Sequence, residues 1–224
     1  MQDPTSFPAT VGETAYERIR LDIIFGRLQP GARLKLDQIK TVYNVSVSTL
    51  REILYRLCAE SLVLAEGQRG FTVAPVSQKN FREVAGMREF LETHALEESF
   101  RRGDVEWEAG VVAAHHRLSR LETQMLSGNR SEPEVWKRYD WEFHRALIAA
   151  CGSTALLATH ARIFDQYLRY QIIAVIFRGE QAANEHRELL QLALSRDHVK
   201  AGQILKRHIH ACVEHTVENG LLPK

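Results

Sequence analysis

From residue 78 onward the sequence is a succession of helical apolar patterns separated only by short breaks, and this feature constrains the fold most. Glycine, serine or aspartate stands at each break, where a helix is expected to end. The predicted helices span residues 78–102, 105–127, 133–151, 154–177, 181–195 and 198–218. Because loops this short favour antiparallel neighbours, we expect a mainly α fold in which residues 78–220 form a six-helix antiparallel bundle.

The first 75 residues follow a different order of elements. Apolar spacing predicts three helices, and two apolar runs around a glycine-containing loop then predict a hairpin. The predicted elements are helices at about 14–25, 36–43 and 46–60 and strands at 62–64 and 71–73. This order is typical of a winged helix-turn-helix, which we place at residues 13–75 after a flexible tail of residues 1–12.

Composition limits the class of protein. Apolar residues make up 45% of the chain, which is enough for a sizeable core. No apolar run approaches the roughly 18 residues that a membrane span needs, and the N-terminus does not resemble a signal peptide, so we expect a cytoplasmic protein. The net charge is +1, and residues 1–75 hold nine Lys and Arg against eight Asp and Glu. Any DNA binding must therefore depend on where the charges lie.

The third predicted helix has the features of a helix that enters the major groove of DNA. Its first residues include the small hydroxyl side chains of Ser46, Ser48 and Thr49, which allow close approach to phosphates and base edges. Arg51 follows and can contact a guanine or a phosphate, and Arg69 lies at the tip of the predicted hairpin. The alternative is that the hydroxyls only cap the helix and that Arg51 pairs with a nearby acid.

Four ligand-type side chains are predicted on the inward faces of three helices in the bundle. Asp140 and His144 are four residues apart and share a face with apolar neighbours, while His186 and His208 each lie on an apolar stripe. One divalent metal would satisfy all four, and nitrogen and oxygen ligands suit zinc, nickel, manganese or iron, of which we favour zinc. A single inward histidine is more often a hydrogen-bonded core residue, so the metal site depends on the four acting together.

The other histidines are not predicted to be ligands. His210 faces away from His208, and His215 lies near the inward stripe, where it could support a ligand. The histidines interpreted as non-ligands are His94, His115, His116, His160 and His198.

Arg88 lies on the apolar stripe of the first helix of the bundle. An interior arginine near a metal can hold a carboxylate through two parallel hydrogen bonds. The alternatives are an ion pair with Glu92, four residues on, or a side chain that extends to solvent.

Four segments of the N-terminal region carry a resemblance to a known family. They are Pro30-Gly31-Ala32-Arg33-Leu34, Ile39 to Ser46, Leu50-Arg51-Glu52-Ile53-Leu54 and Gly70-Phe71-Thr72-Val73. This region resembles the DNA-binding domain of the GntR family of bacterial regulators. The resemblance implies that DNA is contacted by Arg33, Ser46, Ser48, Thr49, Arg51 and the wing residues Arg69 and Gly70. Val47 stands where the family commonly has an arginine, and we expect it to contact a thymine methyl group.

Residues 78–218 resemble the helical FCD effector domain of the FadR-like branch of that family. The matching features are Arg88 with Glu92, the Asp140–His144 pair, His186 near the start of a helix, and Asp197 through Ala201 to His208. Ser153 stands where members often have an asparagine that contacts the effector. The resemblance implies one metal per chain, a small carboxylate effector bound with Arg88 and Ser153, and a homodimer through the C-terminal domain.

Three functions are compatible with these patterns. The first is a repressor whose binding to a near-palindromic double-stranded operator responds to a small organic or sugar acid. The second is a metal-dependent hydrolase or lyase acting on a small acid, which leaves the N-terminal module without a role. The third is a constitutive, metal-stabilised DNA-binding protein. We expect the first, and therefore no enzymatic activity.

Overall fold

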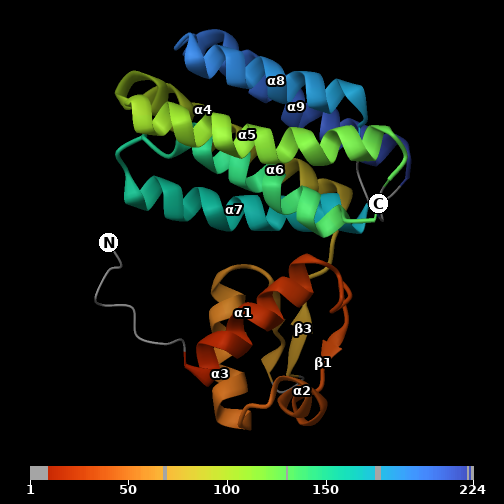
Figure 1. Cartoon of the computed structure of the whole chain (residues 1–224). Helices are drawn as coiled ribbons and strands as arrows, with labels where there is room; N and C mark the ends of the chain where they lie inside the picture. The colour runs from red at the N-terminus through yellow and green to blue at the C-terminus, as the bar shows by residue number, and fades with distance from the viewer. Residues whose placement is uncertain (1–9, 68–69, 130, 175–177, 221, 223–224) are drawn as a thin grey trace. The chain divides into compact units, whose positions relative to one another are not determined.

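The computed structural model describes residues 10–67, 70–129, 131–174, 178–220 and 222. The chain divides into two compact units, one of residues 1–76 and one of residues 77–224. Figure 1 shows that the N-terminal unit combines short helices with a small sheet and that the C-terminal unit is built from helices. These are the winged helix-turn-helix and the mainly α bundle that the sequence predicts.

The N-terminal unit begins earlier than predicted. Helix α1 spans Val11–Ile24, because Thr10 caps it and exchanges hydrogen bonds with Glu13 in a capping box. The expectation of a flexible tail over residues 1–12 is therefore wrong for its last two residues, and residues 1–9 lie outside the described part.

Two further helices form the helix-turn-helix. Helix α2 spans Leu36–Tyr43 and helix α3 spans Val47–Ala59. Asn44 ends α2 in the left-handed conformation, with φ of 53°, which permits the tight turn into α3. The buried face of α3 consists of Leu50, Ile53, Leu54 and Leu57.

A three-stranded antiparallel sheet completes this unit. Its strands are β1 (Arg33–Leu34), β2 (Val63–Ala65) and β3 (Phe71–Val73), in the order β1-β3-β2. Strands β2 and β3 form the predicted hairpin, with Val63 opposite Val73. Strand β1 was not predicted, because a two-residue strand is too short to show an alternating pattern.

The C-terminal unit contains six helices within the described residues. They are α4 (Gln78–Arg102), α5 (Val105–Leu126), α6 (Pro133–Ile148), α7 (Thr154–Ile173), α8 (Glu180–Leu194) and α9 (His198–Glu218). Helix α4 packs against α6, α7 and α9, and α5 packs against α6 and α8, which encloses one core (Figure 1). Helix α6 ends three residues before its predicted end. Beyond Ile148 the backbone bonds reach back three residues instead of four, as in the bond from Cys151 N–H to Ile148 C=O.

Aromatic side chains fill the contact between α4 and α7. Phe81 is fully buried, and its ring stacks on Tyr170 with 4.6 Å between centroids. Because the surrounding helices cannot collapse into the space of a lost ring, we expect Phe81→Ala to lower the free energy of unfolding by about 3–5 kcal/mol.

The three tryptophans of the chain all lie in this unit, so their fluorescence during urea unfolding reports on it alone. Val105→Ala is the control, because Val105 is 71% exposed and its truncation should change the free energy by less than about 0.5 kcal/mol. Equal effects of the two substitutions would contradict the packing described for Phe81.

Candidate metal centre and DNA-reading surface

The first turn of α3 gathers hydroxyl groups at an exposed surface. The Oγ atom of Ser46 accepts the backbone N–H of Thr49 at 3.1 Å and lies 2.8 Å from the Oγ atom of Ser48. Val47 is half-buried, and Arg51 is exposed, with no ion pair or hydrogen bond in the described part of the chain. Ser46 therefore caps the helix, and contact of the three hydroxyls with DNA stays a prediction, as does that of Val47 and Arg51.

The remaining predicted DNA contacts lie at the sheet. Arg33 is exposed on β1, opposite Thr72 of β3. Gly70 precedes β3 with φ of 90°, a conformation that side chains disfavour. Arg69 lies outside the described residues. The structure places Arg33 on β1 and Gly70 just before β3, and their contact with DNA stays a prediction.

Asp140, His144, His186 and His208 meet inside the helical unit. One ligand atom from each lies within 4.8 Å of the others, and all four residues are buried. The centroids of the His186 and His208 rings are 4.7 Å apart, and those of His144 and His208 are 5.2 Å apart. The predicted set thus converges from α6, α8 and α9, as a metal site requires.

Several polar atoms at this cluster are buried without a hydrogen bond among the described residues. Among the described residues, Nε2 of His144, Nε2 of His186 and Oδ2 of Asp140 have no hydrogen bond. Nε2 of His186 lies 3.3 Å from Oδ1 of Asp140. Either a proton or a metal cation between these two atoms would satisfy both of them. The donor set therefore fits a divalent metal.

A glutamate stands behind each of the three imidazoles. Nδ1 of His144 lies 2.5 Å from Glu92 of α4, and Nδ1 of His186 lies 2.7 Å from Glu122 of α5. A proton on Nδ1 satisfies each carboxylate and leaves the Nε2 lone pair directed at the cluster.

The third imidazole has a more crowded partner. Nδ1 of His208 lies 2.9 Å from Glu185 and 3.1 Å from Nη2 of Arg178. If Nδ1 carries a proton, it donates to Glu185 and cannot accept from Arg178. Nη2 of Arg178 then donates to Glu185 at 2.6 Å and to the backbone carbonyl of His208 at 3.3 Å. Three carboxylates from three helices thereby orient three potential ligands.

Burial and these neighbours shift the pKa values of the cluster. Burial lowers the pKa of His144 and lowers that of His208 further below its usual range, where His186 and His144 add to the effect. Burial opposes ionisation of Asp140, but Lys137 and His186 outweigh it and hold its pKa well below the usual value. For His186, Glu122 outweighs burial and raises the pKa. The cluster therefore combines an ionised carboxylate with two imidazoles, those of His144 and His208, whose protonation burial disfavours, while Glu122 favours the protonated form of His186.

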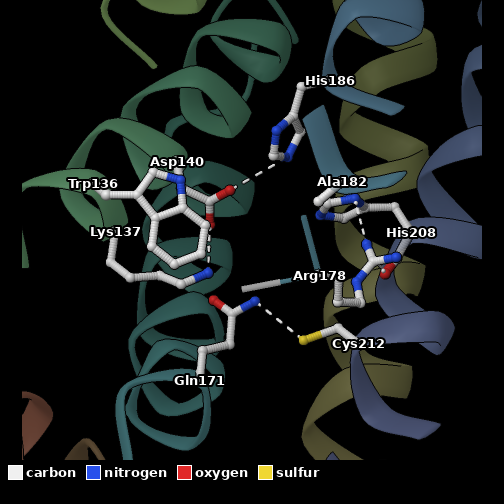
Figure 2. A pocket seen from close by; sticks show the side chains of 9 residues that line it. All are labelled: Trp136, Lys137, Asp140, Gln171, Arg178, Ala182, His186, His208 and Cys212. Carbon is white, nitrogen blue, oxygen red and sulfur yellow. Dashed lines mark hydrogen bonds and ion pairs between the residues drawn. The ribbon is translucent and has the colours of Figure 1, made fainter. Parts of the chain in front are cut away.

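A small cavity opens beside the cluster. Figure 2 shows Trp136, Lys137, Asp140 and Gln171 on one side of it and His186, His208, Arg178 and Cys212 on the other.

The two residues predicted to bind an effector do not line this cavity. Arg88 is fully buried and donates to Glu92 at 2.7 Å, with its guanidinium 4.3 Å from the ring centroid of Phe164. Ser153 caps α7 by accepting the backbone N–H of Leu156. The ion pair with Glu92 considered from the sequence is therefore present, and effector contact by Arg88 or Ser153 stays a prediction.

The sequence did not predict several of the side chains that surround the cluster and the cavity. Glu122 was detectable as a lone acid on the apolar stripe of α5, between Leu118 and Met125. His160 is also buried, and its Nε2 lies 3.1 Å from Glu92, where it supports the carboxylate rather than the metal cluster. For Lys137 and Arg178 no pattern in the sequence indicated burial beside the cavity.

A winged helix-turn-helix joined to a helical unit with a buried ligand cluster defines a class of DNA-binding protein. The family described as bacterial regulatory proteins, gntR family, matches residues 11–73, and the FCD domain matches residues 83–211. The chain belongs to the GntR family, in the branch that carries an FCD domain, and it is a DNA-binding transcriptional regulator.

Individual relatives agree with this family. The chain is 37% identical to an uncharacterized HTH-type transcriptional regulator, BphR, of Paraburkholderia xenovorans, over 94% of this chain and 86% of the relative. It is 32% identical to the HTH-type transcriptional repressor GlaR of Escherichia coli, over 87% and 90%. The solved structure of E. coli McbR/YncC shares the fold, with a TM-score of 0.78 at 16% identity over 95% of this chain and all of that one.

Within the ranges that the structure covers, no helix combines the length and the apolar character needed to cross a bilayer.

The buried pair of Arg88 and Glu92 gives a testable consequence. Glu92→Gln leaves a cation in a fully buried position without its counter-charge, so the free energy of unfolding of the metal-free protein should fall by about 3–5 kcal/mol. Urea unfolding followed by tryptophan fluorescence measures this change. Glu83→Gln, at an exposed position of the same helix, is the control and should alter it by less than about 0.5 kcal/mol. A small effect of both would show that the pair does not support the core.

Proposed function

We propose that this regulator is a repressor whose operator binding is controlled by a small organic or sugar acid, bound at one divalent metal ion per chain. The observation that carries the proposal is the convergence of Asp140, His144, His186 and His208 beside a cavity, with buried ligand atoms that lack hydrogen bonds among the described residues. The name of GlaR as a repressor supports the direction of control.

The metal would be held by these four residues. Nitrogen and oxygen ligands suit zinc, nickel, manganese or iron, and zinc is favoured because His and Asp in a compact cluster match its usual ligands. When bound, the ion supplies coordination positions that a carboxylate oxygen of the effector can fill. Glu92, Glu122 and Glu185 hold the imidazoles in place, and the surrounding helices exclude water from the cluster.

DNA recognition would rest on the N-terminal unit. The start of α3 offers free backbone N–H groups and hydroxyls, and Arg51 adds an exposed cation. We propose contacts from Arg33, Val47, Arg69 and Gly70 as well, in line with the family resemblance.

Pairing of two chains would place two such surfaces on one operator. On α4, Met87 is 47% exposed and Phe90 is 70% exposed, and a second copy of the helical unit would cover these apolar side chains. A two-fold dimer requires a near-palindromic operator. An acid then controls repression only if it binds the DNA-competent and the released states with different affinity.

The DNA assignment is tested with Arg51→Ala. We expect the substitution to weaken binding by about 1–3 kcal/mol, because it removes a cation from the surface proposed to meet DNA. Electrophoretic mobility shifts are measured on a duplex that the wild-type protein selects from a random library. Arg120→Ala, at an exposed arginine of the helical unit, should leave binding unchanged. Unaltered binding by Arg51→Ala would remove α3 as the reading helix.

The metal assignment is tested with Glu122→Gln. The neutral amide orients His186 less strongly, so we expect metal affinity to fall about 10–100-fold. Competition with a chelator measures this affinity, and Glu106→Gln, an exposed change on the same helix, serves as the control.

His144→Ala and His208→Ala should each lower metal content sharply. Full occupancy in both alanine variants by elemental analysis would rule out the ligand set.

A further inference from the structure

The first turn of α4 is held by groups from two distant parts of the helical unit. Ser77 caps this turn by accepting the backbone N–H of Asn80 at 3.1 Å. The hydroxyl of Tyr170, near the end of α7, donates to Oδ1 of Asn80 at 2.6 Å. Gln78 donates through Nε2 to the backbone carbonyl of Leu222, beyond the end of α9, at 3.3 Å. The turn is therefore attached both to α7 and to the segment that follows α9.

Burial accompanies both attachments. Tyr170 is buried, and its ring stacks on Phe81 at an interplanar angle of 16°. Leu222 is only 5% exposed, although it lies two residues from the end of the sequence. The last residues of a chain are usually poorly ordered unless a contact ties them down. The hydrogen bond from Gln78 indicates that the contact for this segment is the start of α4.

The same two helices form part of the cavity wall. Helix α7 contributes Gln171, the residue after Tyr170, and α9 contributes His208 and Cys212. Figure 2 shows Gln171 and Cys212 joined across the cavity, where Nε2 of Gln171 donates to the sulfur at 3.3 Å. The elements that hold the first turn of α4 are thus the ones that border the ligand cluster.

Filling the cluster would restrain these elements. The four ligand residues come from α6, α8 and α9, so α9 is held to the other two helices when His208 shares a metal with them. Tyr167 of α7 donates to the backbone carbonyl of Ile209 of α9 at 3.4 Å, which links α7 to the same restraint. Helix ends open locally more easily than helix centres, so the first turn of α4 responds to the order of whatever holds it.

We propose that the hold of Tyr170 and Leu222 on the first turn of α4 couples occupancy of the ligand cluster to the DNA-reading unit. Filling the cluster orders residues 77–82, and the chain enters this turn directly from residue 76, the last of the N-terminal unit. A ligand that removes motion from one segment changes the affinity of a second site that depends on that segment. This inference rests on the proposed function and specifies how regulation leaves the cluster.

Hydrogen–deuterium exchange of the full chain, with zinc and after chelation, measures the order of this turn. We expect zinc to slow exchange of the amides of residues 80–84 at least fivefold in the wild-type protein. In Tyr170→Phe, which keeps the ring on Phe81 and loses the hydrogen bond to Asn80, the slowing should fall below twofold while zinc affinity stays within twofold. Tyr139→Phe is the matched control, because this half-buried tyrosine of α6 has no hydroxyl hydrogen bond within the described ranges.

A second substitution tests the contact with the C-terminal segment. Gln78→Ala removes the donor to Leu222 and should also reduce the zinc-dependent slowing at least twofold. Lys79→Ala, at the exposed neighbouring position, should preserve it. The amides of residues 108–112, in the first turns of α5, report any stabilisation of the whole helical unit and should slow less than those of residues 80–84.

DNA binding tests the consequence of the coupling. Zinc should change the affinity of the wild-type protein for its selected duplex at least fivefold, and that of Tyr170→Phe less than twofold. The inference is overturned, and the metal site retained, if zinc binds but slows residues 80–84 no more than residues 108–112. Undiminished slowing in Tyr170→Phe, or equal wild-type DNA affinity with and without zinc, has the same meaning. Absence of zinc binding in calorimetry would overturn the proposed function and this inference with it.

Discussion

The helical unit depends on carboxylates that stand between imidazoles and cations in an otherwise apolar interior. Glu92 shows the principle: one fully buried carboxylate accepts from Arg88 and also lies within hydrogen-bond distance of His144 and His160. Without such partners, each buried polar group would destabilise the core by several kilocalories per mole. Glu92 determines which ring nitrogen of His144 faces the cluster, and Glu122 does the same for His186.

This arrangement leaves little to reorganise when a ligand binds. The imidazoles are fixed by hydrogen bonds on one side and by aromatic rings on the other, as where Phe143 lies edge-on to His186 with 5.7 Å between centroids. The helices that carry them are held by the packing of α4 against α7 and α9. A rigid site of this kind can transmit a preference between states, because small ligand differences are not absorbed by local movement.

The DNA-reading surface is built on a different principle. Ser46 stabilises the start of α3 by capping it, and its exposed hydroxyl is one of those that we propose to meet DNA. A structural and a recognition role are compatible, since an N-terminal helix turn retains further free N–H groups for a phosphate. Arg51 is exposed and has no internal partner in the described region, so its guanidinium is free to contact DNA as proposed.

The sequence by itself determined the order of helices and the inward direction of Asp140, His144, His186 and His208, because helical spacing is a local property. It also indicated that Arg88 could pair with Glu92, four residues away. Only the tertiary structure decided that Glu122 stands behind His186, 64 residues distant, and that Lys137 and Arg178 face one cavity. Such pairings depend on how whole helices rotate and pack against each other, and no spacing along one helix encodes that.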